Sequence, residues 1–459
     1  MAGTPDLIIR GGMVVTGGAV VEADVVVQDG VIAGVGRPGT APAAREVVDA
    51  SGKHVIPGAI DAHFHFKTFS LHDDTLESAI RSAAHGGITT VVGFIRGREG
   101  MTARQTVDHF KAEGEKAVVD FAFHLNLGPH DDFAAHIADG LERGITSFKM
   151  FMAYARRGFM LDDGLLYRAM RGVAAAGGLA MVHAENGSII DRLEDEFAEA
   201  GRRSPVDFSH TRPAFAEVEA IRRAIQLAEA AGCPLYVVHV STAGGCAAVA
   251  EARARGLPIT GETCPQYLTL DDGAMARFGS LAKIAPPLRA VADRHALWQG
   301  LTRGDLSTVG SDHSPYRRTA KEASADIFEV PFGAPGTETL LPVLYSEGVL
   351  RRGLSPAWLA RVISENPARV FGLYPRKGII APGADADLVI LDPSVRWTVR
   401  AADLHSVSDY TLFEGMALLG RPVDSWVRGQ RVLRGGEFIA EPGQGRYVAC
   451  AAPGAPAPA

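Results

Sequence analysis

Alternating apolar and polar positions mark both ends of the chain as β-rich. Between residues 7 and 36, runs rich in valine and isoleucine are separated by Gly-Gly and Asp-Gly pairs, a pattern typical of β-hairpins. After about residue 375 the same character returns, in "GADADLVILDP" and "SWVRGQRVLRGGEFI". The economical arrangement packs the two ends together as one β-sandwich domain.

The middle of the chain has a different rhythm. Short apolar runs alternate with segments whose apolar residues recur at helical spacing and end in glycine, such as "FAEVEAIRRAIQLAEAAG". Strand and helix therefore alternate, which predicts an α/β protein with a (β/α)8 TIM-type barrel. The eight runs are "VIPGAIDAHFHF", "ITTVVGFI", "VDFAFHLNL", "SFKMFMAY", "LAMVHAEN", "PLYVVHVS", "PITGETCP" and "LSTVGSDHS".

These patterns divide the chain into four parts. Residues 1–54 and 376–447 are the two segments of the β-sandwich domain, and residues 55–375 form the barrel. The remainder, 448–459, contains the Ala/Pro/Gly-rich string "CAAPGAPAPA" and is predicted to be a flexible tail.

Charge and composition exclude several classes of protein. The 459 residues carry a formal net charge of −7, which argues against binding to nucleic acid or to an anionic membrane, because both need clustered positive charge. No run approaches the roughly 20 apolar residues of a membrane span. The four cysteines have no metal-type spacing and are typical of reduced thiols. We therefore expect a cytoplasmic protein whose partners are small molecules or other proteins.

Titratable residues end the apolar runs of the barrel, where TIM-barrel enzymes carry their chemistry. His63 and His65 are two positions apart, so on a strand both side chains point to one face and could bind one metal ion. A single histidine there is usually a core residue, but several titratable groups at separate strand ends indicate a functional site. The full set is His63, His65, Lys149, His183, His239 and Asp312.

Lys149 is the least expected of these residues, because apolar neighbours surround it in "SFKMFMAY". Burial should depress the pKa of its amine, so that the neutral form can react with CO₂ to give a carbamate (N6-carboxylation) whose two oxygens bridge two cations. The alternative is a lysine whose head group reaches solvent. The flanking metal-type ligands favour the carbamate.

Several motifs resemble the hydantoinase and dihydropyrimidinase family of cyclic amidohydrolases. They span nearly the whole chain and include "DAHFHF", "SFKMFMAY", "MVHAEN", "YVVHVS", "GETCPQYL", "APPLR", "GSDHSP" and "ENPARVFGLYPRKG". The resemblance implies a site for two divalent metal ions, usually zinc, with manganese or cobalt as alternatives. It implies that His63, His65 and Asp312 hold one ion, that His183 and His239 hold the other, and that carboxylated Lys149 bridges them.

A two-metal site of this kind opens a cyclic amide by attack of a metal-bridging hydroxide, because the cations lower the pKa of bound water. Asp312 is expected to act as general base and to deliver the proton to the leaving ring nitrogen. By resemblance, the Tyr154 hydroxyl donates a hydrogen bond to the oxyanion.

Substrate identity is less constrained, because the chain departs from the family pattern. Lys67, after the histidine pair, either binds an acidic substituent or is a solvated loop lysine. Phe332 stands where the family generally has asparagine, and Ala285 where many dihydropyrimidinases have serine. Together with Phe159, Phe64 and Phe69, Phe332 suggests an aromatic pocket.

The leading hypothesis is a hydrolase that opens a hydantoin or dihydropyrimidine ring to an N-carbamoyl amino acid. Lys67 and the "APP" triplet leave an allantoinase-like or dihydroorotase-like specificity open. A third alternative is a non-catalytic scaffold protein, a fate of some family members that predicts missing ligands, whereas all six are present here. The resemblance also implies a homo-oligomer, a tetramer or a dimer.

Overall fold

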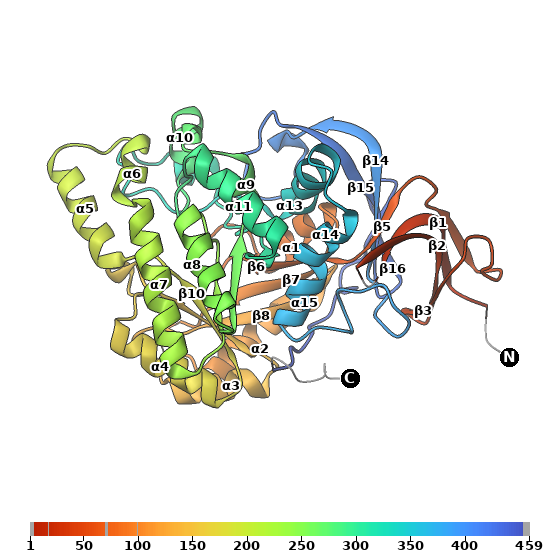
Figure 1. The fold of residues 1–459 in the computed structure, drawn as a ribbon, viewed down its shortest axis with the longest axis horizontal. Helices are drawn as coiled ribbons and strands as arrows, with labels where there is room; N and C mark the ends of the chain where they lie inside the picture. Colours follow the sequence, from red (N-terminus) through yellow and green to blue (C-terminus); the bar gives the residue numbers. More distant parts are fainter. Residues whose placement is uncertain (1–3, 17, 69–71, 99, 453–459) are drawn as a thin grey trace.

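The computed structural model describes residues 4–16, 18–68, 72–98 and 100–452. In it, eight parallel strands form a nearly closed barrel in which neighbours in the sheet follow chain order from β6 to β13 (Figure 1). This confirms the predicted barrel. The strands are β6 (Ala59–Phe64), β7 (Ile88–Ile95), β8 (Asp120–Asn126), β9 (Ser147–Phe151), β10 (Leu179–His183), β11 (Leu235–Val237), β12 (Ile259–Thr263) and β13 (Thr308–Val309).

An outer ring of helices surrounds the barrel, in which the helices that follow successive strands contact each other directly or, at one place, through a short intervening helix. The ring consists of α1 (Leu76–His85), α2 (Ala103–Glu113), α3 (Phe133–Glu142), α4 (Asp163–Ala175), α7 (Ala214–Ala231), α8 (Ala243–Ala254), α11 (Val291–Arg303) and α13 (Thr337–Leu344). The other helices are α5 (Gly187–Glu199), α6 (Pro205–Thr211), α9 (Pro265–Thr269), α10 (Gly273–Phe278), α12 (Arg318–Lys321), α14 (Pro356–Ala360) and α15 (Asn366–Val370). None of the described helices is long and apolar enough to cross a membrane.

The two ends of the chain meet in one mainly antiparallel sheet beside the barrel (Figure 1), as the sequence predicts. We call it the terminal sheet. Its order is β17-β16-β15-β14-β5-β1-β2-β3, and β4 pairs with β1. The strands are β1 (Leu7–Thr16), β2 (Ala19–Gln28), β3 (Val31–Gly36), β4 (Glu46–Asp49), β5 (His54–Pro57), β14 (Leu388–Thr398), β15 (Ala417–Val427), β16 (Gln430–Arg434) and β17 (Glu437–Phe438).

The chain changes sheet at Gly58. The sequence pattern joins residues 55–66 into one run that opens the barrel, but β5 pairs with β1 and β14 in the terminal sheet and β6 alone enters the barrel. Gly58 fits this crossing because a Cβ there would lie 2.1 Å from Thr89 Oγ1 and 2.8 Å from Asp387 Cβ. Only glycine allows so close an approach.

The far end of the chain is also held against the barrel. The backbone amide of Phe121 donates to Arg446 O (2.9 Å), that of Val448 to Phe121 O (2.8 Å) and that of Cys450 to Gly144 O (2.8 Å). Val448 and Cys450 are buried. The prediction of a flexible tail from residue 448 is therefore wrong for 448–452, where tertiary contacts override composition; residues 453–459 lie outside the described part.

Asp61 closes the barrel between its first and last strands. Its buried carboxylate accepts hydrogen bonds from Ser311 N (3.0 Å), Ser311 Oγ (2.5 Å) and Thr337 Oγ1 (2.7 Å). A backbone hydrogen bond from His65 N to His313 O (2.8 Å) also joins the two ends of the barrel sheet. These bonds bring the segment around Asp312 next to the histidines at the end of β6.

The barrel interior has an apolar lower layer beneath the strand ends. Residues from five strands, Ile60, Val92, Ala122, Met181 and Tyr236 among them, cluster there with Phe371. The register of β6 shifts between Asp61 and Phe64, as at a β-bulge. The bulge lets His63 follow Ile60 and Ala62 into the interior, and such re-aiming is a common use of bulges beside active sites.

Candidate functional site

The six predicted ligands line a single cavity of about 130 Å³ at the ends of the barrel strands. Because they lie at the ends of β6, β9, β10 and β11 and in the segment after β13, only the closed barrel brings them together. Tyr154, Phe159, Ala285 and Phe332 line the same cavity, so the structure also gathers four of the five predicted substrate residues.

One group of ligand atoms lies at the junction of β6 with the closing segment. Asp312 Oδ1 is 3.1 Å from His63 Nε2 and 3.3 Å from His65 Nε2. All three ligand atoms lie within 4.8 Å of one another, a spacing that suits one cation with nitrogen and oxygen ligands. Burial opposes ionisation of Asp312, but His63 and His65 outweigh it and hold the pKa of this carboxyl well below its usual range.

A second pair of ligand atoms lies at the ends of β10 and β11. His183 Nδ1 and His239 Nε2 are 2.9 Å apart, and burial lowers the pKa of both imidazoles, which keeps them neutral. Glu185 accepts a hydrogen bond from His183 Nε2 (2.8 Å), which leaves the Nδ1 lone pair directed at His239. Two neutral imidazoles in this arrangement can share a cation.

Lys149 lines the cavity together with both groups of ligands. The residue is 1% exposed, and its Nζ is 5.0 and 5.1 Å from the ring centroids of Phe94 and Phe151. Within the described residues it has no ion-pair partner. Burial lowers the pKa of the amine to about 7, so the neutral, nucleophilic form is well populated near neutral pH. The donor set and this amine fit a two-metal site with a carboxylated lysine.

Strained backbone gathers around the same cavity. Six non-glycine residues in the described chain have positive φ, and four of them line the cavity: His72, Tyr154, His239 and Asp312. Each such conformation costs about 1–3 kcal/mol and persists only when the surrounding structure enforces it. The gathering of strained residues at this cavity indicates that the fold maintains these side-chain positions at the cost of local stability.

Two buried glutamates support the ligands, and the sequence reasoning did not single them out. Glu262, on β12, accepts from His63 Nδ1 (2.6 Å), Tyr236 Oη (2.7 Å) and His239 N (3.0 Å). Glu185 bonds His183 and accepts from Arg212 Nη1 (2.5 Å). Each is an acid at the end of an apolar run, so the signal that identified Lys149 could have identified them as well.

Glu262→Gln should weaken metal binding about 10- to 100-fold, because the amide no longer provides the negative charge that orients His63. The fold should survive, since the amide oxygen can still accept from His239 N. Competition with a chromophoric chelator measures the affinity, and Glu251→Gln, which changes an exposed acid on α8, is the control. Equal affinity in wild type and Glu262→Gln would contradict this role.

Lys67 does not lie in the cavity. Strand β6 ends at Phe64, the Lys67 backbone amide donates to Asp74 O (2.5 Å), and the exposed side chain borders a separate surface groove with Glu77 and His109. Strand alternation therefore no longer governs its direction, and its predicted role in substrate binding loses its basis. Phe64 packs into the core rather than the cavity, and Phe69 lies outside the described residues.

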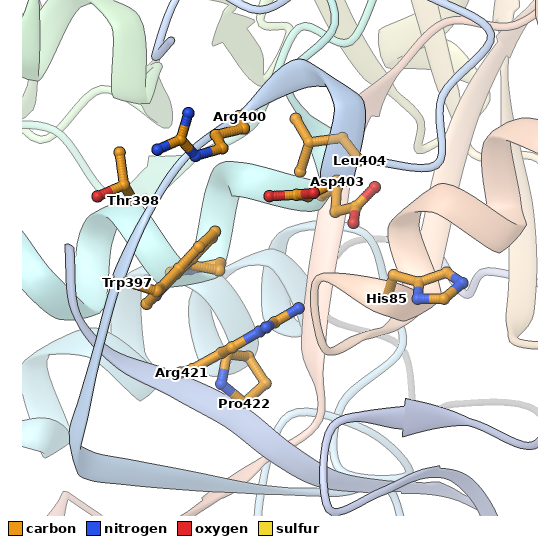
Figure 2. A pocket seen from close by; sticks show the side chains of 10 residues that line it. His85, Trp397, Thr398, Arg400, Asp403, Leu404, Arg421 and Pro422 are labelled. Atoms are coloured by element: carbon orange, nitrogen blue, oxygen red, sulfur yellow. The ribbon is translucent and has the colours of Figure 1, made fainter. Parts of the chain in front are cut away.

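A second cavity, of about 370 Å³, lies between α1 and the terminal sheet and is lined by His85, Trp397, Asp403 and Arg421 (Figure 2). Beside it, His85, Glu338 and His405 form another group of metal-type side chains. However, the two imidazoles stack in parallel with centroids 3.3 Å apart, and Glu338 already accepts from Ser82 and His405. Parallel rings do not aim their nitrogens at one point, so the barrel cavity is the better candidate.

Comparison with known proteins agrees with this assignment. Residues 54–432 match the model of the amidohydrolase family. The chain is 42% identical over 453 residues to a D-hydantoinase of Geobacillus stearothermophilus, covering 96% of each chain. It is 42% identical over 448 residues to an allantoinase of Rubrobacter xylanophilus, covering 96% of this chain and 97% of the relative.

Solved structures give the same result. The crystal structure of a dihydropyrimidinase from Brevibacillus agri has a TM-score of 0.93 and 36% identity, with 98% of this chain and 99% of that chain covered. The family model spans most of the chain, and the relatives match it nearly from end to end. The chain therefore belongs to the amidohydrolase family.

Proposed function

We propose that this protein is a metal-dependent cyclic amidohydrolase that opens hydantoin or dihydropyrimidine rings to N-carbamoyl amino acids. Water adds to a ring carbonyl, the carbon–nitrogen bond breaks, and the single ring-opened product carries the new carboxylate and a free ureido group. The observation that carries the proposal is the convergence of six metal-type ligands in one cavity, in a chain 42% identical to a D-hydantoinase along 96% of its length.

The ligands divide into two sets. His63, His65 and Asp312 would hold one divalent cation, and His183 and His239 the other, with zinc the first choice and manganese or cobalt the alternatives. When bound, the cations lower the pKa of water and polarise a substrate carbonyl. Carboxylation of Lys149, in which the neutral amine adds to CO₂ and loses a proton, would supply a carbamate as a ligand common to the two sets.

Asp312 is the proposed general base. Its pKa is held well below its usual range, so the carboxylate is ionised at neutral pH and free to take a proton from the attacking water. The same carboxyl group then returns the proton to the ring nitrogen as the carbon–nitrogen bond breaks. A neutral ureido nitrogen leaves far more readily than its anion.

Tyr154 is the proposed donor to the oxyanion. Burial raises the pKa of its hydroxyl, which therefore stays protonated, and its ring lies between those of His183 (4.8 Å) and Phe332 (5.4 Å). The left-handed conformation at Tyr154, with φ of 70°, turns the chain just beyond β9. A donor fixed in this way stabilises charge that develops only during the reaction.

Tyr154→Phe should lower kcat about 100- to 1,000-fold with little change in metal content, because it removes one donor to the oxyanion and no ligand. Steady-state kinetics on metal-replete protein measure the effect. Tyr316→Phe, at another tyrosine that lines the cavity, is the matched control. An unchanged kcat in Tyr154→Phe would remove this residue from the oxyanion role.

One alternative specificity has support of its own: the allantoinase relative is as similar, at 42% identity, as the D-hydantoinase. A dihydroorotase-like activity has less support, because Lys67, the residue expected to bind an acidic substituent, lies outside the cavity. The scaffold hypothesis predicts lost ligands, whereas all six line one cavity.

A substrate panel tests the proposal. Metal-replete protein is assayed for ring opening of hydantoin, 5-phenylhydantoin, dihydrouracil, allantoin and dihydroorotate. We expect the hydantoins or dihydrouracil to turn over fastest. Prompt turnover of allantoin alone would reject the proposed specificity in favour of an allantoinase.

A further inference from the structure

The walls of the barrel cavity carry an unbalanced positive charge. Among its described lining residues Asp312 is the sole carboxylate, and it is assigned to a cation. Arg96 and Arg157 also line the cavity, and neither was identified from the sequence. With two cations bound, these guanidinium groups give the cavity an excess of positive charge that favours an anionic ligand.

Arg96 follows β7 and is half-buried. Its guanidinium carbon lies 4.1 Å from the ring centroid of Phe159, and burial lowers the pKa of the group. No carboxylate within the described chain forms an ion pair with it. The nearby acid Asp131 instead accepts from Gly128 N (2.6 Å) and pairs with His136 (3.7 Å). Arg96 is thus a partly desolvated cation that lies near Asp131 but forms no ion pair with it in the described structure.

Arg157 also lines the cavity, from the turn that follows Tyr154. Its guanidinium carbon lies 4.5 Å from the ring centroid of Phe332. In the described structure it too has no ion-pair partner, whereas its neighbour Arg156 pairs with Asp195 at 2.6 Å. The two arginines therefore differ from Arg156 in leaving their donors available to a ligand.

Aromatic rings separate both arginines from the metal ligands. From His183, ring contacts run through Phe151 (5.9 Å) to Phe159 (5.4 Å) and then to Arg96. A second series runs from His183 through Tyr154 (4.8 Å) to Phe332 (5.4 Å) and then to Arg157. A substituent on a substrate ring at the metal ligands would therefore pack along these apolar rings on its way to the arginines.

We propose that the cavity prefers cyclic ureides that carry a carboxylate at the end of a short aliphatic arm, with Arg96 and Arg157 as the specificity-determining residues. The inference rests on the proposed function. The arm packs against Phe159 and Phe332, and the carboxylate accepts charge-assisted hydrogen bonds from the planar guanidinium donors. An acid attached directly to the ring is too short for this contact.

The experiment compares kcat/KM for 5-(2-carboxyethyl)hydantoin and its neutral isostere 5-(2-carbamoylethyl)hydantoin, with metal-replete enzyme. Wild type should favour the acid about tenfold or more, as expected for one or two hydrogen bonds to a charged group. Arg96→Gln and Arg157→Gln should each lower this ratio severalfold, and the double variant should bring it near one. Arg156→Gln, in which the altered arginine already has an acidic partner, should keep the wild-type ratio.

The outcomes separate the inference from the proposed function. The inference is overturned if wild type has equal kcat/KM for the acid and the amide, or if the acid-to-amide ratio is unchanged in both single variants. In either case, turnover of hydantoin would still support the proposed function. Equal losses on both substrates would show that the arginines only cover the aromatic rings, which also overturns the inference. No turnover of any cyclic ureide would reject function and inference together.

Discussion

Lys149→Ala should lose bound metal and activity together. The amine is buried, has no ion-pair partner within the described residues, and lines the same cavity as both groups of ligand atoms. Without a bridge, the five remaining ligands must hold two mutually repelling cations. The metal ions contribute several kcal/mol of transition-state stabilisation, so kcat/KM should fall at least about a thousandfold. Elemental analysis and steady-state kinetics on the same preparation measure both losses.

Rescue and a control make this result specific. Short carboxylic acids such as acetate or propionate should restore part of the activity of Lys149→Ala, because they can place a carboxylate in the space left by the carbamate. Lys67→Ala, which changes an exposed lysine outside the cavity, should keep its metal. Wild-type metal affinity in Lys149→Ala would count against the bridging role.

The sequence predicted the barrel well because burial leaves a clear record in continuous apolar runs. The run "ITTVVGFI" coincides with β7, and every other predicted run contains a barrel strand. An apolar run does not show which of two sheets will bury it, so the pattern wrongly predicts that residues 55–57 belong to the barrel. Composition does not show tertiary contacts either. It therefore predicts a flexible tail at 448–452, although Val448 and Cys450 are buried.

The candidate site was predictable where strands position the side chains. Strand direction alone brings the ends of β6, β9, β10 and β11 to one side, and hence His63, Lys149 and His183 to one cavity. Beyond the strand ends this reasoning fails. Lys67 turns outward, whereas Arg96 and Arg157 turn inward, and both outcomes depend on loop conformations that no local pattern encodes. The positive φ values at His239 and Asp312 are equally invisible in the sequence.

Asp312→Asn should be the most informative test of the catalytic step. The amide keeps the size of the side chain and an oxygen that can ligate a cation, but it cannot take up a proton at neutral pH. General-base catalysis contributes about 10²- to 10⁴-fold, so kcat should fall within or beyond that range while part of the metal is retained. The structural reason is direct: Asp312 Oδ1 is within 3.3 Å of both His63 and His65, at the junction that closes the barrel.

The pH profile adds a second measurement for the same residue. Because the folded-state pKa of Asp312 is depressed, its carboxylate stays ionised as the pH falls through the usual carboxyl range, so any acid limb of wild type should come from protonation of the histidine ligands and loss of metal. Asp312→Asn should therefore lower kcat without changing the position of that limb. Asp131→Asn, at an acid outside the cavity lining, is the control and should keep the wild-type profile. A kcat within tenfold of wild type in fully metal-loaded Asp312→Asn would show that another group moves the proton.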